Sequence, residues 1–413
     1  MGWHALATGT LAERLRASLE EILEALEAHP GPREDPWTAL LYEYADRASH
    51  SEEHAAAATR IFERAVAGIG DLGAVPTLYG GFTGVAWLAS HLTEPEPGDE
   101  DPNAEIDATL CAMLAKRWGS YDLIGGLVGI GVYFCERLDV PGARPVAERS
   151  LELIVDRLTE LATFSSAGAS WFTPGDHLIE PERSLAPNGF YNLGVAHGMP
   201  GIIGLLGEIC GAGVGGTRAR ELLDRSVDWL LAQPPADAVS RFSPWLVPDD
   251  DGRHGGSRLA WCYGDLGVAA VMLRAARRIG APRMEQAAIE MARVQASRRD
   301  DSTMVTDAGL CHGTAGVAHI FNRLYQATGD AELADAARFW LERTLELRQP
   351  GGIAGYRLLS RSESGEARWE DSAGFLTGAA GIGLALVAAT SDVEPSWDRV
   401  LLVSVPPLDH LGR

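Results

Sequence analysis

The sequence predicts an all-α protein in which two layers of helices form a closed ring, an α/α toroid. A short G-x-x-G element occurs six times, and an almost entirely apolar segment follows each copy. Such segments are typical of buried helices, whereas the amphipathic segments between them fit outer helices with one solvent-facing side. Regular alternation of the two kinds indicates a repeat architecture. The six copies begin at Gly81, Gly126, Gly198, Gly264, Gly313 and Gly378.

These patterns place the helices along the chain. The first begins at Thr10 and ends at the His-Pro-Gly-Pro breaker of residues 29–32, because leucine and isoleucine recur on one face between them. Two more are expected at 38–48 and 52–69. Outer helices are expected at 146–161, 217–231, 284–298 and 331–347, and inner helices around 85–88, 130–134, 202–206, 268–273, 317–321 and 382–387.

The glycines are expected to open each inner helix at one rim, where a lack of side chains lets neighbouring inner helices approach closely and where glycine tolerates the tight turn that enters the rim. All six elements would then face the same end of the ring. For the copies at Gly81, Gly126 and Gly378, a role as a packing spacer without chemistry is sufficient. Four polar segments rich in Gly, Pro, Asp and Ser are predicted as loops, at 94–105, 165–188, 234–257 and 349–372.

The composition limits the possible settings. No linker interrupts the helical pattern, so residues 1–413 are expected to form a single domain. The first residues lack the basic segment followed by an apolar one that is typical of a signal peptide, and no run reaches the ~18 apolar residues that a membrane span needs, so a cytoplasmic location is expected. An odd number of cysteines, five, fits a reducing compartment. The net charge of −22 excludes a nucleic-acid partner and favours a basic or neutral peptide.

Two of the G-x-x-G elements carry candidate metal ligands. Cys262 lies two residues before Gly264, and Cys311 and His312 directly precede Gly313. Two thiols and an imidazole are three ligands for zinc, and a three-ligand site with an open fourth position is typical of catalytic zinc. A helix N-terminus would lower the pKa of a thiol placed there and so favour metal binding.

Plainer roles fit the same residue types. Free cysteine often packs as a small apolar residue, and we assign Cys111, Cys135 and Cys210 to the core on that ground. His197 precedes Gly198 and is expected at the same rim as the metal ligands, but a structural histidine at a helix start is an alternative. His319 could line the inner cavity or serve as a hydrogen-bonded core residue.

Three stretches of this sequence resemble the signatures of the lanthionine synthetase C-like family. They are Asn-Leu-Gly-Val-Ala-His-Gly-Met-Pro-Gly at 192–201, Arg-Leu-Ala-Trp-Cys-Tyr-Gly-Asp at 258–265, and Leu-Cys-His-Gly-Thr-Ala-Gly at 310–316. Residues 395–402 are similar to the usual ending of the family. The resemblance covers most of the chain between residues 79 and 402.

The resemblance implies roles for matched positions. The zinc ligands of the family fall on Cys262, Cys311 and His312. This chain has Leu266 where the family usually has proline, which we expect to alter local packing and to leave metal ligation intact.

The acid/base residues proposed for the family fall on His197 and Asp122, and Arg258 and Tyr263 match residues that support the site. For Asp122, a simple helix N-cap is an alternative.

The implied function is that of a stand-alone, zinc-dependent lanthipeptide cyclase. Zinc would hold and deprotonate a cysteine thiol of a precursor peptide, which adds to dehydroalanine or dehydrobutyrine in the same peptide and forms a thioether ring. His197 would protonate the resulting enolate. The implied partner is the dehydrated leader–core precursor peptide, with a lanthipeptide dehydratase and an exporter as further candidates.

Two rival functions remain open from the sequence. One is a relative that adds glutathione to dehydrated residues or serves as a non-cyclising peptide-binding scaffold. The other is an enzyme like the protein prenyltransferases, which also combine an α/α toroid with zinc. Those enzymes use an Asp, a Cys and a separate His, whereas Cys311 and His312 are adjacent here and Cys262 completes the set.

Overall fold

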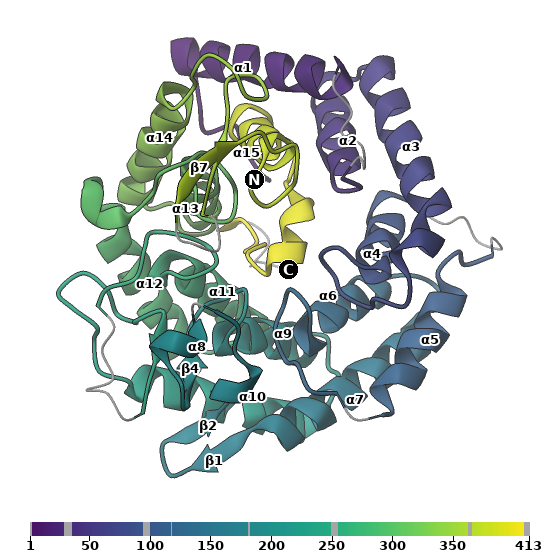
Figure 1. The fold of residues 1–413 in the computed structure, drawn as a ribbon, viewed down its shortest axis with the longest axis vertical. Coiled ribbons are helices and arrows are strands. Elements are labelled where there is room, and N and C mark those ends of the chain that lie inside the picture. The colour runs from purple at the N-terminus through teal and green to yellow at the C-terminus, as the bar shows by residue number, and fades with distance from the viewer. Residues whose placement is uncertain are drawn as a thin grey trace.

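The computed structural model describes residues 2–28, 35–93, 100–116, 118–180, 182–248, 255–361 and 366–408. Figure 1 shows its helices as two concentric layers around a central axis, which confirms the predicted α/α toroid. The inner helices of the described chain are α2 (Thr38–Ser49), α4 (Phe82–Leu92), α6 (Leu127–Arg137), α9 (Met199–Gly211), α11 (Asp265–Ile279), α13 (Thr314–Thr328) and α15 (Ala379–Thr390). The outer helices are α1 (Gly9–Ala28), α3 (Glu52–Ala67), α5 (Ala104–Leu114), α7 (Arg144–Leu161), α10 (Gly216–Ala232), α12 (Pro282–Ala296) and α14 (Ala331–Glu346).

The inner layer is continuous. Each inner helix packs against the next one along the chain, and α15 packs against α2, which closes the ring. The six helices expected after the G-x-x-G elements are confirmed, but α2 is a seventh inner helix that lacks this element. Its residues from Thr38 to Tyr42 are all buried, as in the other inner helices.

Helix α5 was missed by the sequence patterns. It has no clear apolar stripe and lies against α7, and a buried ion pair helps to hold it in place. Asp107 on α5 accepts hydrogen bonds from the Arg137 guanidinium and from the Tyr133 hydroxyl of α6. Because this anchor is ionic, hydrophobic periodicity could not reveal it.

Three of the four predicted loops contain short strands, so the loop prediction was wrong in part. In the described chain, β3 (Phe172–Pro174), β4 (Gly189–Asn192) and β5 (Trp245–Leu246) form an antiparallel sheet, in which Tyr191 pairs with both Phe172 and Leu246. Two hairpins are made by β1 (Thr163–Ser165) with β2 (Gly168–Ser170), and by β6 (Leu358–Arg361) with β7 (Ala367–Glu370). The predicted breaker at 29–32 and the loop portions 94–99, 249–254 and 362–365 lie outside the described residues.

Short helical turns complete the connections. They are η1 (Ile69–Leu72), η2 (Gly175–His177), α8 (Glu182–Leu185), η3 (Asp301–Thr303) and η4 (Ser396–Leu401). Turn η4 lies toward the centre of the ring in Figure 1, where the indole of Trp261 donates a hydrogen bond of 3.0 Å to the carbonyl of Leu401. The C-terminal segment therefore packs beside the connection that precedes α11.

The G-x-x-G glycines accommodate the tight turn that enters each of their inner helices, which is one of the two roles expected for them. The first glycine of each element is the N-cap of its inner helix, and the second lies in the first turn. A Cβ on Gly84 would collide with the carbonyl oxygen of Leu78, and one on Gly267 with that of Trp261. Glycine thus lets each entering connection fold back over its own helix. Other glycines allow close helix contact, such as Gly207 against Ala275.

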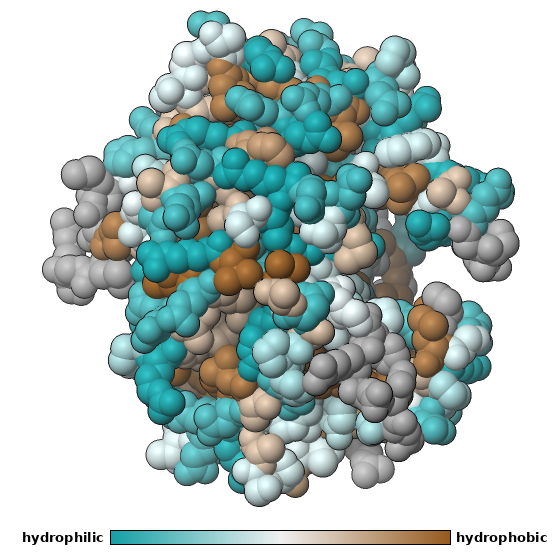
Figure 2. Space-filling view, turned by 90° about the vertical axis from the view of Figure 1, so that its left-hand side faces the viewer, coloured by the Kyte–Doolittle hydropathy of each residue, from teal (hydrophilic) through white to brown (hydrophobic). Residues whose placement is uncertain are grey.

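The outer surface matches the amphipathic pattern of the outer helices. On the face drawn in Figure 2, hydrophilic residues are interspersed with smaller hydrophobic groups. Within the described ranges, no helix combines the length and the apolar character needed to cross a membrane.

The glycine collisions predict a specific stability loss. Gly84→Ala should lower the free energy of unfolding by about 1–3 kcal/mol, the usual cost of forcing extra atoms into a packed core. This cost should exceed the ~1 kcal/mol gain in helix propensity of alanine over glycine. The urea denaturation midpoint measures it. The control is Gly70→Ala, where a Cβ meets no atom within 4 Å, and equal midpoints for the two variants would contradict the collision.

Candidate metal centre

Backbone hydrogen bonds join the connections that enter successive inner helices. The amide of Leu123 donates to the carbonyl of Ala196 (3.0 Å), and the amide of Ala196 donates to that of Cys262 (3.4 Å). The amide of Cys262 donates to Cys311 (3.3 Å), and that of Cys311 to Leu376 (2.7 Å). We call this series the backbone rim. It brings five stretches that are distant in sequence to one end of the ring, as predicted.

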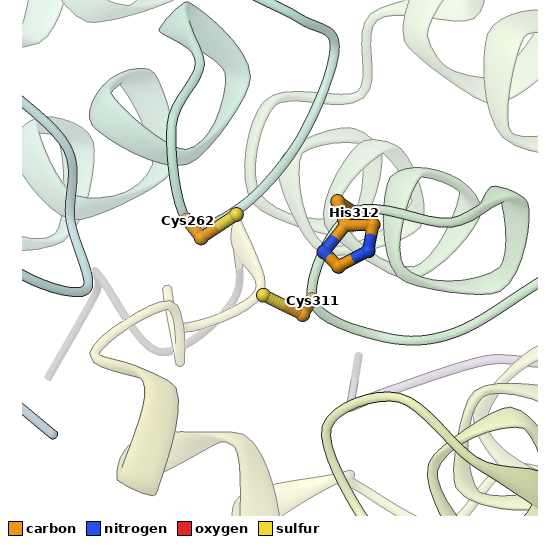
Figure 3. A group of neighbouring side chains, drawn as sticks. All are labelled: Cys262, Cys311 and His312. Carbon is orange, nitrogen blue, oxygen red and sulfur yellow. The ribbon is translucent and has the colours of Figure 1, made fainter. Parts of the chain in front are cut away.

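Three side chains on the backbone rim converge. The ligand atoms of Cys262, Cys311 and His312 all lie within 4.8 Å of one another, and Figure 3 shows the Cys262 sulfur pointing toward the imidazole and the Cys311 sulfur pointing toward that of Cys262. Cys262 is buried, and the other two are half-buried. The structure therefore brings together the three residues that were predicted as metal ligands.

The three groups polarise one another. A hydrogen bond from the Cys311 thiol lowers the pKa of Cys262 well below its usual value, and His312 and the charge of Arg258 act in the same direction. The same contact and burial raise the pKa of Cys311, while the bond to Cys262 raises the pKa of His312. A thiol with a lowered pKa beside a second thiol and an imidazole is a donor set that suits zinc, and three such ligands would leave a fourth coordination position open.

A separate acid/base pair lies on the neighbouring connections. His197 Nδ1 is 2.8 Å from Asp122 Oδ2, and since a carboxylate can only accept, His197 is the donor. Burial alone would lower the pKa of His197, but the hydrogen bond and charge of Asp122 and the charge of Cys262 raise it. Asp122 is not an N-cap, because that position of α6 is Gly126. Its Oδ1 instead accepts from the amide of Gly125 (2.7 Å).

Two supporting residues have distinct surroundings. The Tyr263 ring stacks on His197, with 6.1 Å between the ring centroids, and its hydroxyl accepts a hydrogen bond from Asn192 Nδ2 (3.1 Å). Burial raises the pKa of Tyr263, so it remains protonated. Arg258 contributes positive charge that lowers the pKa of both cysteines. All seven predicted site residues thus belong to four adjacent connections.

The remaining candidates prove structural. His319 is buried, its Nε2 lies 2.9 Å from Asp398 Oδ2, and burial lowers its pKa, so the core alternative is correct. The other three cysteines pack against the core but are only half-buried, which corrects their expected burial.

Sequence reasoning gave no role to Asn192 or Asp307. Each lies six residues before the first glycine of its element, and this shared position is the signal that could have indicated them.

A cleft of about 700 Å³ opens beside the acid/base pair. Asp122, His197 and Tyr263 form one part of its wall, and residues from β3 to α8, including Ile179 and Glu182, form another. The predicted loop at 165–188 therefore contributes to a surface on which a substrate could lie next to His197.

Comparison with known proteins identifies the family of this chain and structures with a similar fold. The model of the "lanthionine synthetase C-like protein" family matches residues 37–402, which is most of the chain. This protein belongs to the lanthionine synthetase C-like family. Its fold is similar to that of nisin cyclase, with a TM-score of 0.73 and 19% sequence identity over 94% of this chain and 97% of that one. A sugar epimerase from a ruminal bacterium matches more weakly, with a TM-score of 0.48 and 10% identity over 92% of this chain and 98% of that one.

For this lanthionine synthetase C-like protein, the converging donors predict one zinc ion per chain. Cys262→Ala and Cys311→Ala should each reduce the bound zinc strongly, as measured by elemental analysis after dialysis. Cys210→Ala is the matched control and should keep the wild-type content. Full zinc in either of the first two variants would remove that residue from the site.

Removing the metal should leave the fold largely intact. The inner layer buries far more apolar surface than one three-ligand site can organise, so the helical circular dichroism signal should persist after treatment with a chelator. Collapse of that signal, reversed by added zinc, would instead identify the metal as a structural element.

Proposed function

We propose that this protein is a zinc-dependent lanthipeptide cyclase, which joins a peptide cysteine to a dehydroalanine or dehydrobutyrine of the same peptide through a thioether bond. The observation that carries the proposal is the placement of a soft three-ligand site and a His–Asp pair on adjacent connections. Family membership and the likeness to nisin cyclase support it.

Cys262, Cys311 and His312 would hold the zinc ion. When bound, zinc would supply a Lewis acid that lowers the pKa of a thiol from the substrate. The polarisation of Cys262 by its neighbours fits this use, because a ligand thiol must be deprotonated to bind a metal.

His197 is suited to the proton transfer that completes the addition. The cysteine sulfur forms its bond to the β-carbon of the dehydro residue, and the α-carbon of that residue then takes up a proton. Over the whole reaction, one proton leaves the thiol and one is added to the α-carbon. Asp122 occupies Nδ1, which leaves Nε2 of His197 for the cleft. A raised pKa keeps more of the imidazole protonated near neutral pH and so favours its use as the acid.

The neighbouring side chains would fix this acid in place. Tyr263 restricts the His197 ring by stacking, and Asn192 fixes the Tyr263 hydroxyl. Arg258 would stabilise negative charge near the thiols and on the enolate oxygen, since it already lowers the pKa of Cys262.

The substrate would be a dehydrated precursor peptide that lies in the cleft beside His197. A chain with a net charge of −22 is compatible with a neutral or basic peptide. Membership of the lanthionine synthetase C-like family leaves the prenyltransferase-like alternative without support. Incubation with a dehydrated peptide and free glutathione separates cyclisation from glutathione addition, since only the second product gains mass.

His197→Asn tests the proton donor. The variant should keep its zinc and form thioethers ~10²-fold more slowly, because asparagine cannot act as an acid at neutral pH. Free-thiol counts over time, corrected for the uncatalysed reaction, measure the rate. His50→Asn is the control and should keep the wild-type rate, because His50 is exposed at the end of α2 and does not line this cleft. An unaltered rate in the His197 variant would assign this residue to structure.

A further inference from the structure

Asp307 is a buried carboxylate beside the candidate metal centre. Its side chain is in the connection that enters α13, five residues before His312, and the residue is 2% exposed. Its Oδ2 lies 3.7 Å from Nε2 of His312 and accepts from the amide of Leu359 in β6 (3.4 Å). Burying a carboxylate is costly without compensation, and in the described chain no arginine or lysine pairs with this one.

The equivalent position of another repeat shows which part of this side chain the turn requires. Asp307 Oδ1 accepts from the amide of Gly309 (3.1 Å), and at the equivalent position Asn192 Oδ1 accepts from the amide of Gly194 (3.0 Å). An amide side chain is therefore sufficient to hold this turn. The two side chains differ in the other terminal atom. In Asp307 this atom is Oδ2, an acceptor that faces His312, whereas in Asn192 it is Nδ2, which donates to the hydroxyl of Tyr263.

The tautomer of His312 decides whether it can bind a metal. A neutral imidazole carries one N–H and one lone pair, so an acceptor at Nε2 places the N–H there and leaves the lone pair on Nδ1. Figure 3 shows one ring nitrogen of His312 facing the two sulfurs and the other directed away from them. Carboxylates that accept from the outer nitrogen of a ligand histidine orient the ring and increase its basicity.

We propose that Asp307 is a positioning residue for the metal centre. Its Oδ2 selects the Nε2–H tautomer of His312 and directs Nδ1 toward the metal, and its contact with Leu359 ties hairpin β6–β7 to the same ligand. At 3.7 Å the contact is longer than a hydrogen bond, so the negative carboxylate favours the Nε2–H dipole of the neutral ring, and a small rotation of the ring as a metal binds would bring the two atoms into hydrogen-bond range. The inference rests on the metal site of the proposed function, but it does not depend on the reaction.

The test is the zinc affinity of Asp307→Asn, measured by competition with a chromophoric chelator at fixed pH. Asparagine should keep the turn, as Asn192 does, but cannot provide a carboxylate for Nε2–H. Zinc affinity should fall by about 10–100-fold, the usual effect of losing such a partner. The matched control is Asp300→Asn, an exposed carboxylate that caps Ser302 in the same connection, and its affinity should stay at the wild-type value.

Combining variants shows whether Asp307 acts through His312. If it does, adding Asp307→Asn to His312→Ala should cause no further loss of zinc affinity. Unchanged affinity in Asp307→Asn alone, or a full additional loss in the double variant, would overturn the proposal. Absence of zinc binding by the wild-type protein would instead overturn the metal site itself, so the two failures are distinguishable.

Hydrogen exchange of the wild-type protein tests the link to the hairpin without any substitution. Amides of β6–β7 should exchange more slowly with zinc than without it, while those of hairpin β1–β2 should exchange equally in both states. Equal exchange of β6–β7 in the two states would overturn the coupling between the hairpin and His312.

Discussion

The backbone rim is the interaction on which the site depends. Every inner helix of the described chain except α2 begins with a glycine that lets its connection fold back, and these connections then hydrogen-bond to one another through main-chain groups. Main-chain bonds do not depend on side-chain identity, so the residues beside them are free to carry chemistry. The amides of Trp261 and Cys262 both donate to Cys311, which fixes the spacing of the two thiols before any metal is present.

Equivalent positions in successive repeats have acquired different chemistry on this common frame. Cys262 and Cys311 each lie two residues before the first glycine of their element and provide thiols, whereas Ala196, at the same position, is followed by His197. Asp122 comes from the repeat before that and reaches His197 through its side chain. The ring thus converts a linear repeat into a site with soft ligands on one side and an acid/base pair on the other.

The sequence predicts the features that recur in every repeat. It does not predict features that depend on a single contact between residues distant in sequence. The inner helices after each G-x-x-G element and the convergence of Cys262 with Cys311 follow from period and position alone. Helix α2 takes an inner position without the motif, and α5 is anchored by the ion pair of Asp107 and Arg137. The role of Asp307 depends on β6, which follows it by about fifty residues and lies in a segment predicted as loop. No local pattern encodes that approach.

The separation of the two sides also determines which groups control the pKa of His197, the proposed acid. The charge of Cys262 raises the pKa of His197, but a metal ion held by thiolates would neutralise much of that charge. The contribution of Asp122 is independent of the metal, because its hydrogen bond to Nδ1 is made by the preceding repeat. With a metal bound, Asp122 is therefore the group that would still raise the pKa of His197. Without Asp122, metal binding would lower the pKa of His197 and leave less of the imidazole protonated at neutral pH.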